Sequence, residues 1–134
     1  MRMKLSATIA GAVLFLAAVP AWAHHAFAAE FDASKPVTLK GTVTKVEWIN
    51  PHSWIHIDVK NADGTVTNWM VEGGSPNALL RRGVTKSLLP EGTEIVIDGY
   101  RAKDGTFRAN GRNITLADGR KLSVGGNSAE EQPK

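Results

Sequence analysis

Apolar and polar residues alternate along most of the chain after residue 36, and this pattern predicts β-strands. The clearest stretch is Trp54–Lys60, where Ile55, Ile57 and Val59 face one way and the residues between them face the other. Comparable patterns predict further strands over Val37–Ile49, Val66–Glu72, Glu94–Ala102 and Arg108–Leu116. A short last strand through Leu122 and Val124 is left open.

Turn and helix signals separate these strands. Asp63-Gly64 predicts a tight hairpin between the second and third strands. After the third strand, Ser75 suits a helix N-cap and Pro76 the first helical position, and Gly83 ends the short helix over residues 77–82. The order is therefore three strands, a helix and two strands.

This order predicts an all-β fold, a small five-stranded OB-like Greek-key barrel with one short helix between strands 3 and 4. Gly41, inside the long first strand, fits a bulge or a sharp coil of that strand. Another small β-sandwich or barrel is the alternative. We expect the barrel domain to span residues 37–124, after an N-terminal arm over 24–36 and before a flexible tail over 125–134.

The first 23 residues have the pattern of a cleavable secretory signal. Two basic residues precede an apolar run over residues 5–19, and Ala21-Trp22-Ala23 supplies the small residues that a signal peptidase requires. The alternative, a membrane anchor, fits less well because the run is short. We therefore expect cleavage between Ala23 and His24, no stable membrane span afterwards, and a location in the periplasm or outside the cell.

Composition narrows the function classes. The chain has 134 residues with 16 Lys and Arg against 13 Asp and Glu, and removal of Arg2 and Lys4 with the signal leaves 14 against 13. No basic block or basic aromatic stripe occurs, which argues against nucleic acid as a partner. The absence of cysteine excludes disulfides, thiolate metal sites and covalent haem attachment.

Four histidines, His24, His25, His52 and His56, are the candidate metal ligands. Cleavage before His24 would free an α-amine that chelates a metal together with the His24 ring, and His25 adds a second chelating arrangement. Imidazole and amine nitrogens suit Cu(II) or Zn(II), and the single methionine of the mature chain, Met70, argues against a Met-rich Cu(I) carrier.

His52 and His56, from the first loop and the second strand, could complete such a site, with an oxygen from one of four acidic residues: Glu30, Asp32, Glu47 or Glu72. Each histidine also has an ordinary structural explanation, as a terminal, turn or strand residue.

A second hypothesis is a docking module without metal, in which Trp48, Asn50 and Trp54 beside the first loop bind a peptide, glycan or envelope protein. The two tryptophans have packing against neighbouring strands as their alternative role. No catalytic triad, phosphate-binding glycine loop or paired-carboxylate motif occurs, so a small copper oxidase or oxygenase is the least favoured function.

The mature chain resembles a family of small exported bacterial proteins that is known only as a domain of unknown function. The resemblance runs from residue 24 to about 124 and is carried by His24-His25-Ala26-Phe27, Glu30-Phe31-Asp32, Leu39-x-Gly41-x-Val43, Glu47-Trp48, Asn50-Pro51-His52, Trp69-x-x-Glu72, Ser75-Pro76, Leu80-x-Arg82-Gly83 and Asp118-Gly119-Arg120. It implies export, an OB-like barrel and a double histidine as a family feature. It implies no activity, cofactor or partner.

Overall fold

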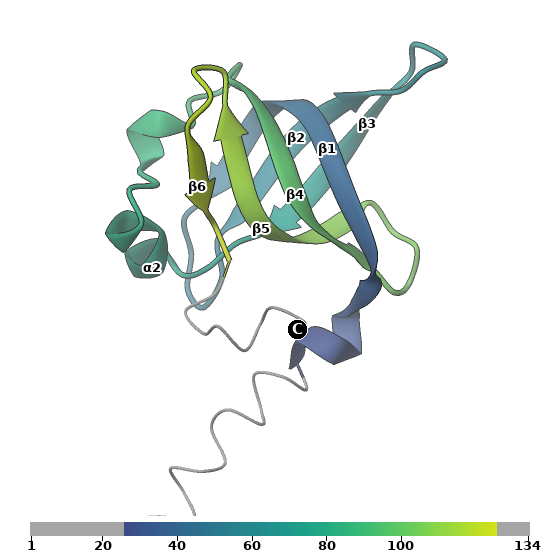
Figure 1. Ribbon diagram of the computed structural model, residues 1–134, viewed down its shortest axis with the longest axis horizontal. Helices are drawn as coiled ribbons and strands as arrows, with labels where there is room; N and C mark the ends of the chain where they lie inside the picture. The colour runs from purple at the N-terminus through teal and green to yellow at the C-terminus, as the bar shows by residue number, and fades with distance from the viewer. Residues whose placement is uncertain (1–25, 126–134) are drawn as a thin grey trace, which may run out of the picture.

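The computed structural model describes residues 26–125, in which one sheet of six strands curls into a ring (Figure 1). Residues 26–30 form a helical turn ahead of the first strand. The elements are β1 (Phe31–Glu47), β2 (Trp54–Lys60), β3 (Val66–Glu72), helix α2 (Pro76–Arg81), the 3₁₀ turn η1 (Lys86–Leu88), β4 (Glu94–Ala102), β5 (Arg108–Leu116) and β6 (Lys121–Ser123).

The ring closes because β3 pairs with β5. The strand order is β3-β2-β1-β4-β5-β6, and the additional parallel pairing of β3 with β5 runs from Met70 opposite Arg108 to Glu72 opposite Asn110. All the other pairs are antiparallel. The predicted all-β barrel, with its short helix between the third and fourth strands, is confirmed. The short β6 adds a sixth strand, which the sequence had left open.

The core fills the inside of the ring. Ile55 and Ile57 on β2 are fully buried, as their alternation predicts, and Val59 is half-buried nearer the hairpin. Leu79, from the segment that contains α2, is also fully buried and belongs to the same apolar cluster. The helix segment thus contributes apolar residues to the barrel core, although the alternating strand pattern is interrupted there.

The predicted cap of α2 is confirmed. Pro76 is the first residue of the helix, and the Ser75 hydroxyl accepts a hydrogen bond from the backbone N–H of Ala78 at 3.3 Å. The helix ends ahead of Gly83, whose φ of 82° is a conformation that side-chain-bearing residues rarely adopt.

β1 begins at Phe31 and not at Val37 as the sequence predicted. Phe31 pairs with Ala102 and Pro36 with Tyr100, with an irregular register between them, so a segment without regular alternation extends the strand. Phe31 is only 2% exposed, and its burial explains why this part of the chain stays on the barrel.

The bulge expected at Gly41 lies instead between Val43 and Lys45. Gly41 has a different role, because a Cβ there would lie 2.7 Å from the carbonyl oxygen of Asp58 on β2. The two strands therefore approach too closely at this point for any side chain.

The predicted signal over 1–23, His24, His25 and residues 126–134 of the predicted tail lie outside the described residues. Among residues 26–125, no helix has the length and apolar character needed to cross a membrane.

Candidate functional site

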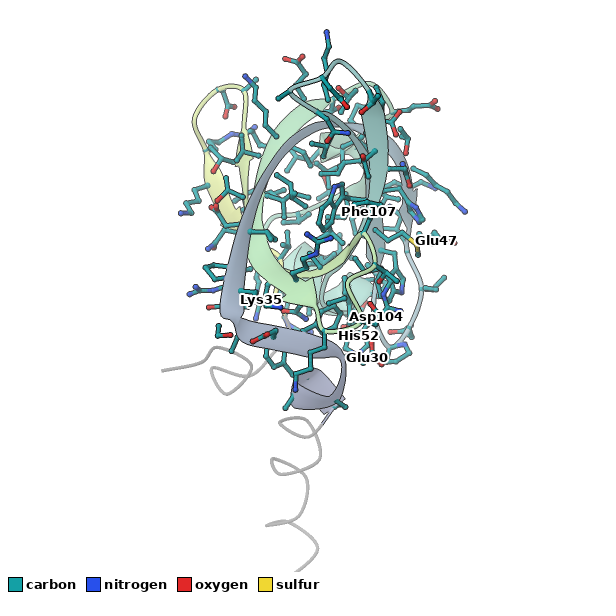
Figure 2. The ribbon with its side chains drawn as sticks, turned by 90° about the vertical axis from the view of Figure 1, so that its right-hand side faces the viewer. Glu30, Lys35, Glu47, His52, Asp104 and Phe107 are labelled. Carbon is teal, nitrogen blue, oxygen red and sulfur yellow. The ribbon has the colours of Figure 1, made fainter. Side chains whose placement is uncertain are left out.

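The N-terminal helical turn and the barrel form a small, partly open cavity of about 140 Å³. We call it the N-terminal cavity. The residues that line it come from the helical turn, from the start of β1 and from the rest of the barrel. They are Ala26, Phe27 and Glu30 in the turn, Phe31 in β1, and His52, Trp54, Glu72 and Asn110 in the rest of the barrel. Figure 2 shows His52 and Glu30 at the same end of the barrel, beside this turn. Both polar and aromatic side chains therefore face this space.

Aromatic packing and backbone hydrogen bonds hold the helical turn in place. The Phe27 ring lies 5.9 Å from the Phe31 ring and, edge to face, 5.9 Å from the Tyr100 ring. The backbone N–H of Lys103 donates to the carbonyl oxygen of Glu30 at 2.9 Å, and the Lys103 ammonium donates to the carbonyl of Ala28. These contacts fix the helical turn, and with it Ala26, against the barrel.

Arg108, the first residue of β5, links the arm to the barrel. Its Nη2 donates to Oε2 of Glu30 at 3.2 Å, and its guanidinium lies 5.9 Å from the centres of both the Phe31 and Trp54 rings. One side chain therefore contacts residues of the arm, of β1 and of β2. Arg108 does not itself line the cavity, but it contacts three residues that do, and we regard it as the residue that holds them together.

His52 and Glu72 form the first of two histidine–carboxylate pairs. The His52 Nδ1 lies 3.2 Å from Oε1 of Glu72, and the side chains are 42% and 11% exposed, respectively. The loop that carries His52 is fixed to the end of β3 by two hydrogen bonds, from the Ser53 N–H to the Gly74 carbonyl and from the Gly73 N–H to the Ser53 carbonyl. Since an ionised carboxylate only accepts hydrogen bonds, it favours the Nδ1–H tautomer and leaves Nε2 for another partner.

His56 and Glu47 form the second pair, on β2 and β1. The His56 Nε2 donates to Oε2 of Glu47 at 2.8 Å, and the His56 side chain is only 15% exposed. The hydrogen bond from His56, followed by the one from Lys45, lowers the pKa of Glu47 below its usual value. The carboxylate is thereby kept ionised, and the His56 ring is held in one orientation.

Of the four predicted histidines, the described residues include two, His52 and His56. His52 lines the N-terminal cavity, whereas His56 is absent from its lining, and His24 and His25 lie outside residues 26–125. Within those residues no three acidic or histidine side chains are grouped closely enough to hold a metal ion. A metal site in the cavity with three or more such ligands therefore needs residues from outside the described part of the chain, 26–125.

The three predicted docking residues lie in three different environments. Trp48 is partly buried against the hydrophobic core, Asn50 is exposed in the loop, and Trp54 is half-buried in the cavity wall. Packing thus explains Trp48, whereas Trp54 faces the cavity.

Sequence reasoning named Glu30 and Glu72 as possible oxygen donors, and both line the cavity. It assigned no role to Arg108 or Phe27. Phe27 lies in the resemblance motif beside the double histidine, but its contacts with Tyr100 join residues far apart in the sequence. No local sequence pattern could therefore have indicated the roles of Arg108 and Phe27.

Comparison with known proteins gives one match. The model of a family described as "Family of unknown function (DUF6152)" matches residues 12–113, which is about three quarters of the chain. No curated protein and no solved structure matches this chain.

Proposed function

Because this chain belongs to that family of unknown function, we propose its function from its own residues: it is an exported protein that binds Cu(II) or Zn(II) at the N-terminal cavity. The ligands that we assign are the α-amine and ring of His24, the ring of His25 and the ring of His52. Glu72 orients His52 and is not itself a ligand.

The observation that carries this proposal is the position of Ala26 in the cavity wall with His52 and Glu72. His25 is bonded directly to Ala26, so its Cα lies about 3.8 Å from the Cα of Ala26 in a trans peptide. His24 is one residue further. The double histidine is thus joined directly to a residue of the wall that also contains His52, and cleavage after Ala23 would add a free amine to the proposed set.

The chemistry of His52 supports its role as a ligand. Glu72 lies against its Nδ1, and a carboxylate on one ring nitrogen is the arrangement that commonly orients a metal-binding histidine through the other. A set of imidazole and amine nitrogens suits Cu(II) and Zn(II), and the bound metal would be held without thiolate ligands.

The size of the cavity favours an ion over an organic ligand. Its volume of about 140 Å³ is small, whereas pockets for drug-sized organic molecules measure roughly 300–1,000 Å³. The docking hypothesis is also weakened because Trp48, one of its three residues, packs against the hydrophobic core. A peptide or glycan therefore has less support than a metal ion.

Calorimetric titration with Cu(II) of the protein that starts at His24 tests the proposal. We expect binding of one ion per chain, a large loss of affinity in the H24A/H25A double variant, and about a tenfold loss or more in His52→Ala. A chain with one extra residue ahead of His24 should also bind more weakly, because its α-amine has moved.

His56→Ala serves as the matched control, since His56 is not part of the cavity wall. It should bind Cu(II) as tightly as the unchanged protein. Equal Cu(II) affinity in the unchanged protein and the H24A/H25A variant would overturn the proposal. The intact mass of the protein isolated from its host tests export separately, because cleavage after Ala23 removes residues 1–23.

A further inference from the structure

We propose a second metal site, on the outer face of the barrel, in which His56 and Met70 together bind a soft monovalent ion, Cu(I). It is separate from the N-terminal cavity and does not depend on His24, His25 or His52. The inference rests on the pairing of these two side chains across β2 and β3.

His56 and Met70 stand directly opposite each other in the register of β2 and β3. On an antiparallel pair, residues in this relation have Cβ atoms about 4.5–5.5 Å apart on the same face of the sheet. Both residues lie between the inward-facing positions Ile55, Ile57, Trp69 and Val71, so both side chains point outward, and both are half-buried. The two side chains are therefore cross-strand neighbours on the outer face of the barrel.

The contact with Glu47 prepares the His56 ring for this role. Nε2 donates to Oε2 of Glu47, which leaves the lone pair of Nδ1 available in the neutral ring. Glu47 is on β1 and Met70 is on β3, on the two sides of β2. The ring is thus held by a carboxylate from the β1 side, as in known metal-binding histidines, and Met70 is its neighbour on the β3 side.

Ligand softness selects the ion. Thioether sulfur favours Cu(I) over the harder divalent ions, and imidazole also binds copper. Met70 is the only methionine after residue 3, and it lies on a face whose neighbouring outward positions on β3 are the polar residues Asn68 and Glu72. A methionine packed into the core would not indicate a metal site. Met70, in contrast, is half-exposed and lies opposite a histidine.

The surroundings carry both signs of charge, with Arg108 opposite Met70 in the pairing of β3 with β5 and Lys45 opposite His56 in the pairing of β1 with β2. Trp54, two residues before His56 on the same face of β2, already has the guanidinium of Arg108 at 5.9 Å from its ring centre. Glu47 carries the compensating negative charge beside His56 and also contacts Lys45 at 3.1 Å. A monovalent ion adds less charge here than a divalent one would.

Titration with Ag(I), a soft monovalent ion that resists oxidation, tests the site in an H24A/H25A/H52A variant of the protein without its signal. Labelling of the methionine methyl carbon gives an NMR signal for Met70, apart from any added initiator methionine. We expect that signal to shift on addition of one equivalent of Ag(I). Met70→Leu should lose the binding, and Glu47→Gln should weaken it about tenfold.

Met70→Leu conserves volume and should fold normally, which its circular dichroism checks. Its Cu(II) affinity, with His24, His25 and His52 intact, should be unchanged, so failure of this site and failure of the proposed function give different results. A Met70 methyl signal that does not move with Ag(I), or equal Ag(I) affinity in Met70→Leu and its parent, would overturn the inference.

Discussion

Arg108 Nη2 lies 3.2 Å from Glu30 Oε2, and this contact joins the N-terminal helical turn to the first residue of β5. The same guanidinium faces the rings of Phe31 and Trp54. The N-terminal cavity exists because this arm is attached to the barrel. Residues that hold the arm should therefore control metal binding without being ligands.

Arg108→Met tests this relationship. Loss of the ion pair and of two cation–π contacts should cost about 1 kcal/mol or more of arm attachment, which corresponds to about a fivefold or greater loss of Cu(II) affinity. Calorimetry measures the affinity, and limited proteolysis near Glu30 reports release of the arm. Lys35→Ala, which removes a longer ion pair with Asp32 at 3.9 Å, is the control and should leave both unchanged. Unaltered Cu(II) affinity in Arg108→Met would show that the arm is held by other contacts.

The barrel itself should depend on its inward-facing strand residues. Ile57 is fully buried at the centre of β2, so Ile57→Ala should destabilise the protein by about 2–5 kcal/mol. Val66→Ala, at a position that is 60% exposed on the neighbouring strand, should change stability by less than about 0.5 kcal/mol. Urea unfolding of both variants measures the difference, and a similar small loss in each would contradict the assigned core.

The strands and the arm differ in how far the sequence predicts them. The bounds of β4 and β5 follow from alternation and from the turns around Gly105 and Gly119, which are local signals. The start of β1 was missed because residues 31–36 do not alternate, and their pairing with Ala102 and Tyr100 is long-range. Local patterns carry no information about such partners.

The same distinction holds for the candidate site. The sequence pointed to all four histidines and to their possible carboxylate partners as separate residues. It could not assign Glu72 to His52 and Glu47 to His56, because those pairings depend on strand register and loop position. The same limit applies to Met70. The sequence shows it only as a lone methionine, whereas the strand register makes it the cross-strand partner of His56.

Two turns should make the protein sensitive to acid. Hydrogen bonds from the side chain and then the backbone of Thr65 lower the pKa of Asp63, and Thr106 does the same for Asp104. Because the folded-state pKa lies below the unfolded value of about 3.9, the stabilisation is complete above that pH and is lost as the pH falls through the folded pKa.

The D63N/D104N double variant should therefore show a weaker fall of Tm below about pH 4 than the unchanged protein. Thermal unfolding followed by circular dichroism at a series of pH values measures this slope. Lys60→Ala, near the first turn but in contact with neither carboxylate, should retain the original slope. Identical slopes in the double variant and the unchanged protein would show that other acidic groups dominate the response.

Glu72 should affect metal binding through His52 and not by direct coordination. Its side chain is 11% exposed and its carboxylate lies against Nδ1 of His52, so Glu72→Gln keeps the shape of the residue but removes the charge that favours the Nδ1–H tautomer. We expect Cu(II) affinity to fall about tenfold. In His52→Ala, where there is no ring to orient, Glu72→Gln should produce almost no further loss, and this non-additivity identifies a positioning role. Calorimetry of the two single variants and the double variant measures it. Equal losses in both backgrounds would instead indicate that Glu72 binds the metal by itself.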